Sequence, residues 1–150
     1  MYERKTVTLA EAKIGVEAAI KWASERRPDR PMAVAVVDDR GELICLERMD
    51  GAQKLYGDMA YKKAYTAAQS RRDTRNLLER LRETDISVSD GFGVLYTVIP
   101  GGQLIAKEGT PPQSPEVYGA IGASGSTGDE DEAMAIAGLE AIKSVLWPSK

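Results

Sequence analysis

Two strand-like segments joined by a short turn constrain the fold of this chain most strongly. Residues 32–37 (Met-Ala-Val-Ala-Val-Val) form an unbroken apolar run with β-branched residues, which predicts a buried strand. Residues 38–41 (Asp-Asp-Arg-Gly) form a turn, and residues 42–48 resume a strand pattern. Because a connection this short joins antiparallel neighbours, the pair predicts a hairpin. The side chains of its second strand are expected to alternate, with Leu43 and Cys45 on one side and Ile44 and Leu46 on the other.

The remaining elements follow from hydrophobic spacing and from turn residues. Apolar residues at helical spacing predict a helix from Leu9 to Arg26, which begins with a capping box at Thr8 and Glu11. Further helices are expected over residues 54–72, around residues 77–81 and over residues 129–146, further strands over residues 94–99, 103–106 and 117–123, and loops over residues 84–93 and 107–116. The chain therefore predicts one α+β domain over residues 1–150, with a five-stranded, mainly antiparallel sheet flanked by helices.

Composition and charge narrow the function classes. The 150 residues carry a net charge of −3 and show no stripe of Lys or Arg, so nucleic acid is not an expected partner. Cys45 is the only cysteine, which excludes an intramolecular disulfide and a cysteine-based zinc site. No apolar run is long enough to span a bilayer, and the first residues lack the apolar core of a secretory signal. We therefore expect a cytoplasmic protein with no membrane partner.

The absence of histidine restricts the chemistry further. Histidine is the commonest general acid/base in enzymes and a frequent haem ligand. Proton transfer in this chain must therefore use carboxylates, lysines or tyrosines. A haem iron would have to be held by Cys45, by Met49, or by a tyrosine such as Tyr96 or Tyr118. Cys45 is interpreted as a small packing residue in the middle of a strand.

The strand–loop–helix segment near the C-terminus is the strongest candidate for a ligand site. After the strand over residues 117–123, residues 124–128 (Ser-Gly-Ser-Thr-Gly) form a loop that leads into the last helix. Glycine lets a ligand approach the backbone, and the first N–H groups of a helix have no partner within it. A loop that needs glycine for its turn and Ser or Thr for its cap explains the same pattern.

The acidic run that follows this loop lowers the expectation of an anion site. Residues 129–132 (Asp-Glu-Asp-Glu) complement the helix dipole themselves and oppose a second negative charge. Asp129, Asp131 and Glu132 also have the oxygen ligands that a hard cation prefers, but no loop of suitable spacing surrounds them. We expect a solvated helix start and no metal site.

Four segments of the chain, in order, resemble the GlcG/HbpS-like family. They are residues 34–43 with residues 48–52 (Arg-Met-Asp-Gly-Ala), residues 60–67 (Ala-Tyr-Lys-Lys-Ala-Tyr-Thr-Ala), residues 100–105 (Pro-Gly-Gly-Gln-Leu-Ile), and residues 119–125 (Gly-Ala-Ile-Gly-Ala-Ser-Gly) with Asp131 and Glu132 downstream. The third segment departs from the family pattern, since Leu104 stands where a proline is usual. Together the segments cover nearly the whole chain.

The resemblance implies more about the fold than about the function. It implies a profilin-like α/β/α sandwich that forms a homo-oligomer, and the chain is similar to the C-terminal domain of PduO-type corrinoid adenosyltransferases. Some family members bind haem, and others belong to catabolic operons. Haem is therefore the cofactor that the resemblance implies, and the absence of histidine disfavours it here.

Lys63 and Asp50 are the candidate catalytic residues. If Lys63 is buried, its pKa could fall into a useful range, or it could form an ion pair with Asp50 or another carboxylate that holds the helix on the sheet. Asp50 could equally cap the helix that follows it. The expected ligand-binding residues are Met49, Gly122, Ser124, Gly125 and Ser126.

Three functions stay open at this point. In the first, the protein binds a small organic acid or related metabolite, and Lys63 or Asp50 transfers a proton in a step of isomerase or lyase type. In the second, it is a haem- or tetrapyrrole-binding sensor or carrier. In the third, it is a non-catalytic accessory subunit with no ligand of its own.

Overall fold

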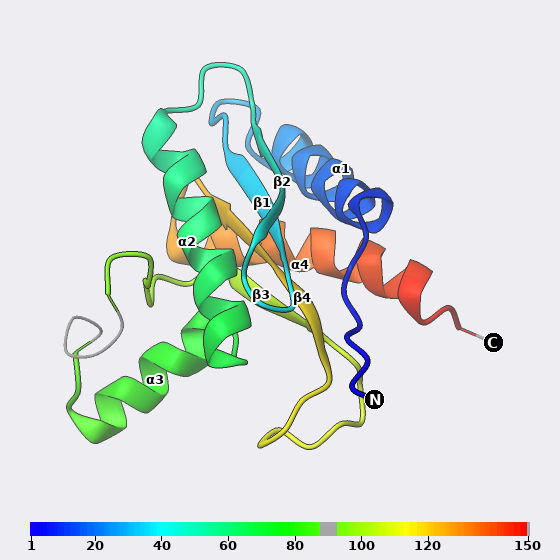
Figure 1. Cartoon of the computed structure of the whole chain (residues 1–150). Helices are drawn as coiled ribbons and strands as arrows, with labels where there is room; N and C mark the ends of the chain where they lie inside the picture. Colours follow the sequence, from blue (N-terminus) through cyan, green and yellow to red (C-terminus); the bar gives the residue numbers. More distant parts are fainter. Residues whose placement is uncertain (88–92, 150) are drawn as a thin grey trace.

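The computed structural model describes residues 1–87 and 93–149 (Figure 1). Its elements are α1 (Leu9–Arg26), β1 (Ala33–Asp38), β2 (Leu43–Arg48), α2 (Lys54–Ser70), α3 (Thr74–Thr84), β3 (Gly102–Ala106), β4 (Val117–Ser124) and α4 (Gly128–Leu146). The predicted α+β class is confirmed, but the sheet in this part of the chain has four strands and not five. Residues 88–92 of the expected loop lie outside the described residues.

The strands form one antiparallel sheet in the order β2-β1-β4-β3. The register of β1 on β4 pairs Ala35 with Gly122 and Val36 with Ile121. Because successive side chains of a strand point to opposite faces, the first pair faces α2 and the second faces α1 and α4. Helix α2 covers one face while α1 and α4 cover the other, so the domain has three layers (Figure 1).

Strand β1 has the buried position that its apolar sequence predicts. Ala33, Val34, Ala35, Val36 and Val37 are all fully buried, because both faces of this central strand are covered. The largest hydrophobic cluster lies between the sheet and helices α1 and α4. The cluster under α2 consists largely of alanines, so that helix lies close to the sheet.

The expected alternation of side chains along β2 is wrong. Val36 pairs with Cys45, whereas Val37 pairs with Leu43, so the register shifts at Ile44. A bulge of this kind places two residues of one strand opposite a single step of its partner. Ile44 and Cys45 consequently both pack against the large cluster, while Leu43 and Leu46 are exposed.

The strand expected over residues 94–99 is absent, although its apolar residues suggested one. The Thr97 N–H donates to Thr66 Oγ1 of α2 at 2.9 Å, and the Ile99 N–H donates to Thr97 Oγ1 at 3.3 Å. These backbone groups therefore bind side chains and not a neighbouring strand. Val94 and Ile99 are exposed, so the apolar composition of this segment does not reflect core packing.

The two helices on the α1/α4 face begin with side-chain caps. At α1 the predicted capping box is present, since Thr8 accepts from the Glu11 N–H and Glu11 accepts from the Thr8 N–H. At α4, Thr127 accepts from the Glu130 N–H at 3.2 Å. Among the residues described, no helix combines the length and apolar character needed to cross a membrane.

Candidate functional site

The most unusual feature of the interior is a buried ion pair between α2 and α4. Lys63 Nζ lies 2.8 Å from Asp131 Oδ2 and donates a second hydrogen bond of 2.9 Å to the Ala123 carbonyl oxygen. The two side chains are only 1% and 4% exposed. Charges that are removed from water in this way need both a partner and further hydrogen bonds, and this pair has both.

The pair also shapes the loop between β4 and α4. Asp131 Oδ1 accepts from the Ser126 N–H at 2.8 Å, so one carboxylate connects Lys63 to the loop backbone. Burial lowers the pKa of Lys63, and the nearby Asp131 carboxylate acts in the opposite direction. The expectation that Asp131 is part of a solvated helix start is wrong, because the carboxylate points inward to meet Lys63.

The acidic residues next to Asp131 form ion pairs of their own. Arg75 pairs with Asp129 at 2.6 Å and with Glu132 at 2.9 Å, and Arg27 pairs with Glu130 at 2.6 Å. Each carboxylate of the run is thus balanced by a cation from another segment. Among the residues that the structure describes, no group of His, Cys, Asp and Glu is arranged to hold a metal ion.

Glycines at three positions allow the backbone to close around Lys63. A Cβ at Gly122 would lie 2.3 Å from the Ala60 carbonyl oxygen, and one at Gly102 would lie 2.3 Å from the Lys63 carbonyl oxygen. Gly101 lies directly over the lysine side chain, where a Cβ would be 3.0 Å from Nζ. Three of the four segments that carry the family resemblance therefore meet at this ion pair, which explains their spacing in structural terms.

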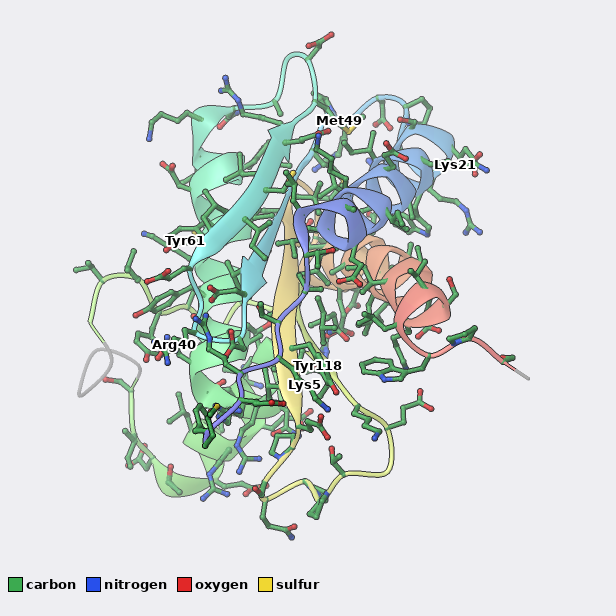
Figure 2. All side chains as sticks on the ribbon, turned by 45° about the vertical axis from the view of Figure 1, so that its right-hand side comes forward. Lys5, Lys21, Arg40, Met49, Tyr61 and Tyr118 are labelled. Carbon is green, nitrogen blue, oxygen red and sulfur yellow. The ribbon has the colours of Figure 1, made fainter. Side chains whose placement is uncertain are left out.

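The expected ligand-binding residues gather near one end of the sheet, with the exception of Gly122. Met49 follows directly after β2 (Figure 2). The Met32 N–H donates to Met49 Sδ at 3.4 Å, and the Met49 N–H donates to the Met32 carbonyl oxygen at 2.9 Å. Gly125 packs against the same Met32, and Ser124 is opposite Ala33 in the sheet. Gly122 lies further along β4, against α2.

A cleft of about 350 Å³ opens at this end of the sheet. Its walls are the turn before β1, the turn before α2 with the first turn of that helix, and the β4–α4 loop, through the residues Asp29, Arg30, Pro31, Gly51, Gln53, Tyr56 and Gly125. Arg27 joins two of these walls, because it binds Asp29 at 3.2 Å and Glu130 at 2.6 Å and donates to Ser126 Oγ at 3.4 Å. The cleft thus combines a cation, a carboxylate that is paired with Arg27, an amide, a phenol and two glycine backbones.

The structure separates the two candidate catalytic residues. Lys63 is buried beneath the loop, whereas Asp50 is exposed in the turn next to Gly51, which lines the cleft. Lys63 pairs with Asp131 and not with Asp50. Asp50 does not cap α2 either, because Gln53 is at the N-cap position and makes no side-chain capping bond.

Sequence reasoning did not single out Arg30, Gln53 and Tyr56. Arg30 lies in the turn before β1, whereas Gln53 and Tyr56 lie at the start of α2, more than 20 residues further along the chain, and none of them belongs to the segments that carry the resemblance. The one sequence signal for this cleft is Gly51, since glycine is typical of tight turns. The structure bears out such a turn after β2, where Gly51 has a positive φ of 84°. Asp131 was considered, but its burial has no signature in an acidic run at a helix start.

The chain has the class of fold and site expected of a small ligand-binding α+β protein, and comparisons with known proteins agree. The family model described as "Haem degrading protein HbpS-like" matches residues 7–140. This chain belongs to the HbpS-like family. It is 29% identical over 141 residues to an uncharacterized 15.0 kDa protein encoded in the dhaT-dhaS intergenic region of Citrobacter freundii, covering 90% of this chain and 91% of that one. Protein GlcG of Escherichia coli K12 is 32% identical over 93 residues, which cover 62% of this chain and 63% of GlcG.

Solved structures support the same assignment. A double mutant of HbpS from Streptomyces reticuli is 29% identical, with a TM-score of 0.79 and coverage of 93% of this chain and 89% of that one. Klebsiella pneumoniae protein ORFY has a TM-score of 0.82 at 24% identity, over 96% of this chain and 95% of its own, which shows a shared fold. The family and the fold are therefore established on nearly the full length of the chain.

Proposed function

We propose that this protein binds a small organic carboxylate in the cleft between Arg30, Tyr56 and Gly125. The observation that carries the proposal is the donor set of the cleft, where Arg30 provides a guanidinium and Gln53 an amide. A guanidinium binds a carboxylate through two parallel hydrogen bonds, and glycine backbones let a small ligand come close. A volume of about 350 Å³ suits a small metabolite.

Lys63 has a positioning role in this proposal and not a catalytic one. Its side chain is 1% exposed and its ammonium binds Ala123 and Asp131, so it does not reach the cleft. Through Asp131 it holds the Ser126 backbone and with it the loop that presents Gly125. Proton transfer of isomerase or lyase type would fall to Asp50, which adjoins the cleft in sequence and is exposed to solvent.

Haem is the second candidate ligand, favoured by the family match and by Tyr56. Tyrosine is a known haem ligand, and Tyr56 lines the cleft beside Arg30, which suits a propionate. The other ligating side chains fit less well, since Met49 already accepts a hydrogen bond and Cys45 packs on the core. In this arrangement Tyr56 would hold the iron and Arg30 a propionate, and the bound haem would supply redox chemistry.

Titration of wild type and variants with glycolate and with hemin tests both candidates. Glycolate binding is measured by calorimetry and hemin binding by the Soret band. Arg30→Gln is expected to weaken the binding of either ligand by about tenfold, because it removes a charge-assisted hydrogen bond. Arg26→Gln, an exposed arginine in the last turn of α1, is the matched control and should change neither.

Tyr56→Phe separates the two ligands. It should abolish a defined, stoichiometric Soret shift if haem binds through the phenol, and it should leave glycolate binding within about twofold, because the ring and the arginine remain. Binding of neither ligand by the folded wild-type protein would overturn the proposal and favour an accessory subunit. A Soret shift that survives Tyr56→Phe would exclude the phenol as the iron ligand.

A further inference from the structure

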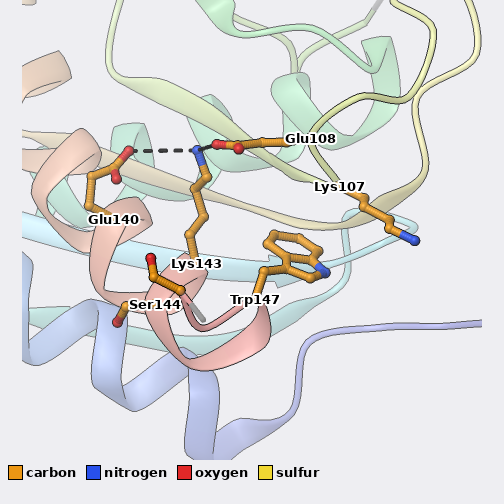
Figure 3. Close-up of a pocket in the computed structure, with 7 residues that line it drawn as sticks. Lys107, Glu108, Glu140, Lys143, Ser144 and Trp147 are labelled. Carbon is orange, nitrogen blue, oxygen red and sulfur yellow. Dashed lines mark ion pairs between the residues drawn. The ribbon is translucent and has the colours of Figure 1, made fainter.

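A second cleft, of about 390 Å³, lies at the opposite end of α4 from the Gly125 loop (Figure 3). Its walls come from the start of the β3–β4 loop, the last two turns of α4 and the residues after that helix, through Lys107, Glu108, Glu140, Lys143, Ser144, Trp147 and Ser149. In Figure 3 the Lys143 ammonium lies between the two carboxylates, with the Trp147 ring beside it. None of these residues has a part in the first cleft.

The aromatic wall of this second cleft is held in place. The Trp147 ring contacts Tyr118 edge-on, with ring centroids 5.2 Å apart and an interplanar angle of 76°. The Tyr118 hydroxyl donates to Glu116 at 2.5 Å, and Glu116 in turn pairs with Lys5 at 3.3 Å. Trp147 also packs against the large core cluster. The indole therefore has a fixed position and does not need to be ordered when a ligand binds.

The ion pairs of this second cleft can be broken with little loss of stability. Lys143 Nζ lies 2.5 Å from Glu108 and 3.7 Å from Glu140, and the two carboxylate side chains are 77% and 63% exposed. Ion pairs with such exposed partners contribute little stability. The Lys143 side chain is 23% exposed, and the hydrogen bond with Glu108 and the charge of Glu140 raise its pKa and keep it charged. Lys107 makes no ion pair with any described residue.

We propose that this second cleft binds an aromatic monocarboxylate. The ring of the ligand packs on Trp147, and its carboxylate replaces Glu108 as the partner of Lys143. The two lysines and two glutamates give the cleft no net charge, which suits a single negative charge better than a phosphate dianion. This inference concerns other residues than the proposed function and does not depend on it.

The test uses the two tryptophans, whose indole N–H groups give separate resonances in a ¹H–¹⁵N spectrum of the whole chain. Trp22→Phe assigns them. During a titration with 2-naphthoate, the Trp147 resonance is expected to shift to saturation while that of Trp22, on α1, stays in place. Equal shifts of both resonances, or no saturation, would overturn the proposal.

Variants then test the role of each charge. Lys143→Met should weaken 2-naphthoate binding about tenfold, because it removes the charge-assisted contact. Glu108→Gln should strengthen binding by about two- to fivefold, because it removes an exposed competitor for Lys143. Lys21→Met, an exposed lysine on α1, is the matched control and should leave binding unchanged.

Two further ligands define the chemical class. Cyclohexanecarboxylate should bind about two- to tenfold more weakly than 2-naphthoate, because it lacks the aromatic contact with Trp147. Naphthyl phosphate should also bind more weakly than 2-naphthoate, because the cleft has no net charge to balance a dianion. Tighter binding of the phosphate, or an unchanged affinity in Lys143→Met with its fold retained by circular dichroism, would refute the assignment.

Discussion

Helix α2 contacts one face of the sheet through alanines and glycine, whereas α1 and α4 cover the other face with larger aliphatic side chains. On the α2 side the cluster is Val37, Ala64, Ala67, Ala68 and Ala120. On the other side Val16, Ile121, Met134 and Ile142 fill the space. Small residues bring the α2 backbone within reach of β4, so the Ala123 carbonyl oxygen accepts from the Lys63 ammonium and Gly101 lies against the end of the lysine side chain.

The difference shows how a small domain can bury a full charge. The α1/α4 layer excludes water with apolar volume and has no need of polar partners. The α2 layer offers few large apolar side chains, and its Lys63 ammonium lies within 3 Å of the Ala123 carbonyl oxygen of β4 and of the Asp131 carboxylate at the start of α4. The same arrangement extends through Asp131 to the Ser126 loop, which links the packing of this face to the cleft at the end of the sheet.

The largest expected effect comes from removing the buried cation. Lys63→Met should lower the free energy of unfolding by about 3–5 kcal/mol, because it leaves the Asp131 charge buried without its cation. Urea denaturation followed by circular dichroism measures this. Lys54→Met is the matched control: it removes a pair of the same 2.8 Å length whose side chains are 83% and 49% exposed, and should lose less than about 1 kcal/mol.

The companion variant distinguishes an uncompensated charge from a loss of packing. Lys63→Met combined with Asp131→Asn removes both charges and should recover part of the stability lost by the single change. A double variant less stable than the single one, or a Lys63→Met protein no less stable than Lys54→Met, would show that the ion pair does not hold α2 on the sheet.

A second, smaller effect tests the close approach of α2. Gly122→Ala should lower stability by about 1–3 kcal/mol, because its Cβ would meet backbone atoms of Ala60 and Ala64 at 2.3 and 2.6 Å. Gly57→Ala makes the same chemical change within α2, where the nearest atoms are side-chain carbons at 3.6 and 3.8 Å. It should raise stability by about 0.5–1 kcal/mol through helix propensity. Thermal unfolding of both variants measures whether stability falls in Gly122→Ala and rises in Gly57→Ala.

The smallest effect concerns a partly buried carboxylate, Asp73, that forms no ion pair with any residue the structure describes. Asp73 precedes α3 and accepts from the Leu104 N–H at 2.7 Å, and burial raises its pKa above the ordinary 3.8. The folded state therefore binds more protons than the unfolded state just above pH 3.8, so this group lowers stability as the pH rises through that window. Asp73→Asn keeps an acceptor for Leu104 and removes the charge.

We expect the Asp73→Asn protein to lose this part of the pH dependence and to be stabilised slightly at pH 7 relative to wild type. Urea unfolding of both proteins between pH 4 and pH 7 measures this difference in the pH dependence of stability. A variant whose stability falls with rising pH as steeply as wild type would show that Asp73 is not the group responsible.

Local patterns predicted the elements with strong periodicity and clear boundaries. The hairpin partners, the capping box at Thr8 and the last helix all follow from spacing within a few residues. The wrong predictions fall where contacts with residues distant in the sequence override the local conformational preference. The Thr97 N–H binds a side chain of α2 in place of a strand, and a bulge at Ile44 moves Cys45 to the same face as its neighbour.

The candidate site shows the same limit. Lys63, Met49 and the 124–126 loop could be selected from sequence because they lie in segments that resemble one family. Asp131 as the partner of Lys63, and Arg30 with Tyr56 as walls of the cleft, could not, since each depends on which segments meet in space.

The sequence by itself determined the α+β class, the antiparallel hairpin and the exclusion of histidine chemistry, because these depend on residue type and short-range spacing. Only the tertiary structure decided that Lys63 is paired and buried, and that Asp50 lies apart from it. The physical reason is that the charge state of an ammonium depends on water and partners within a few ångströms. Those surroundings come from Ala123 of β4 and Asp131 of α4, which lie 60 and 68 residues further along the chain.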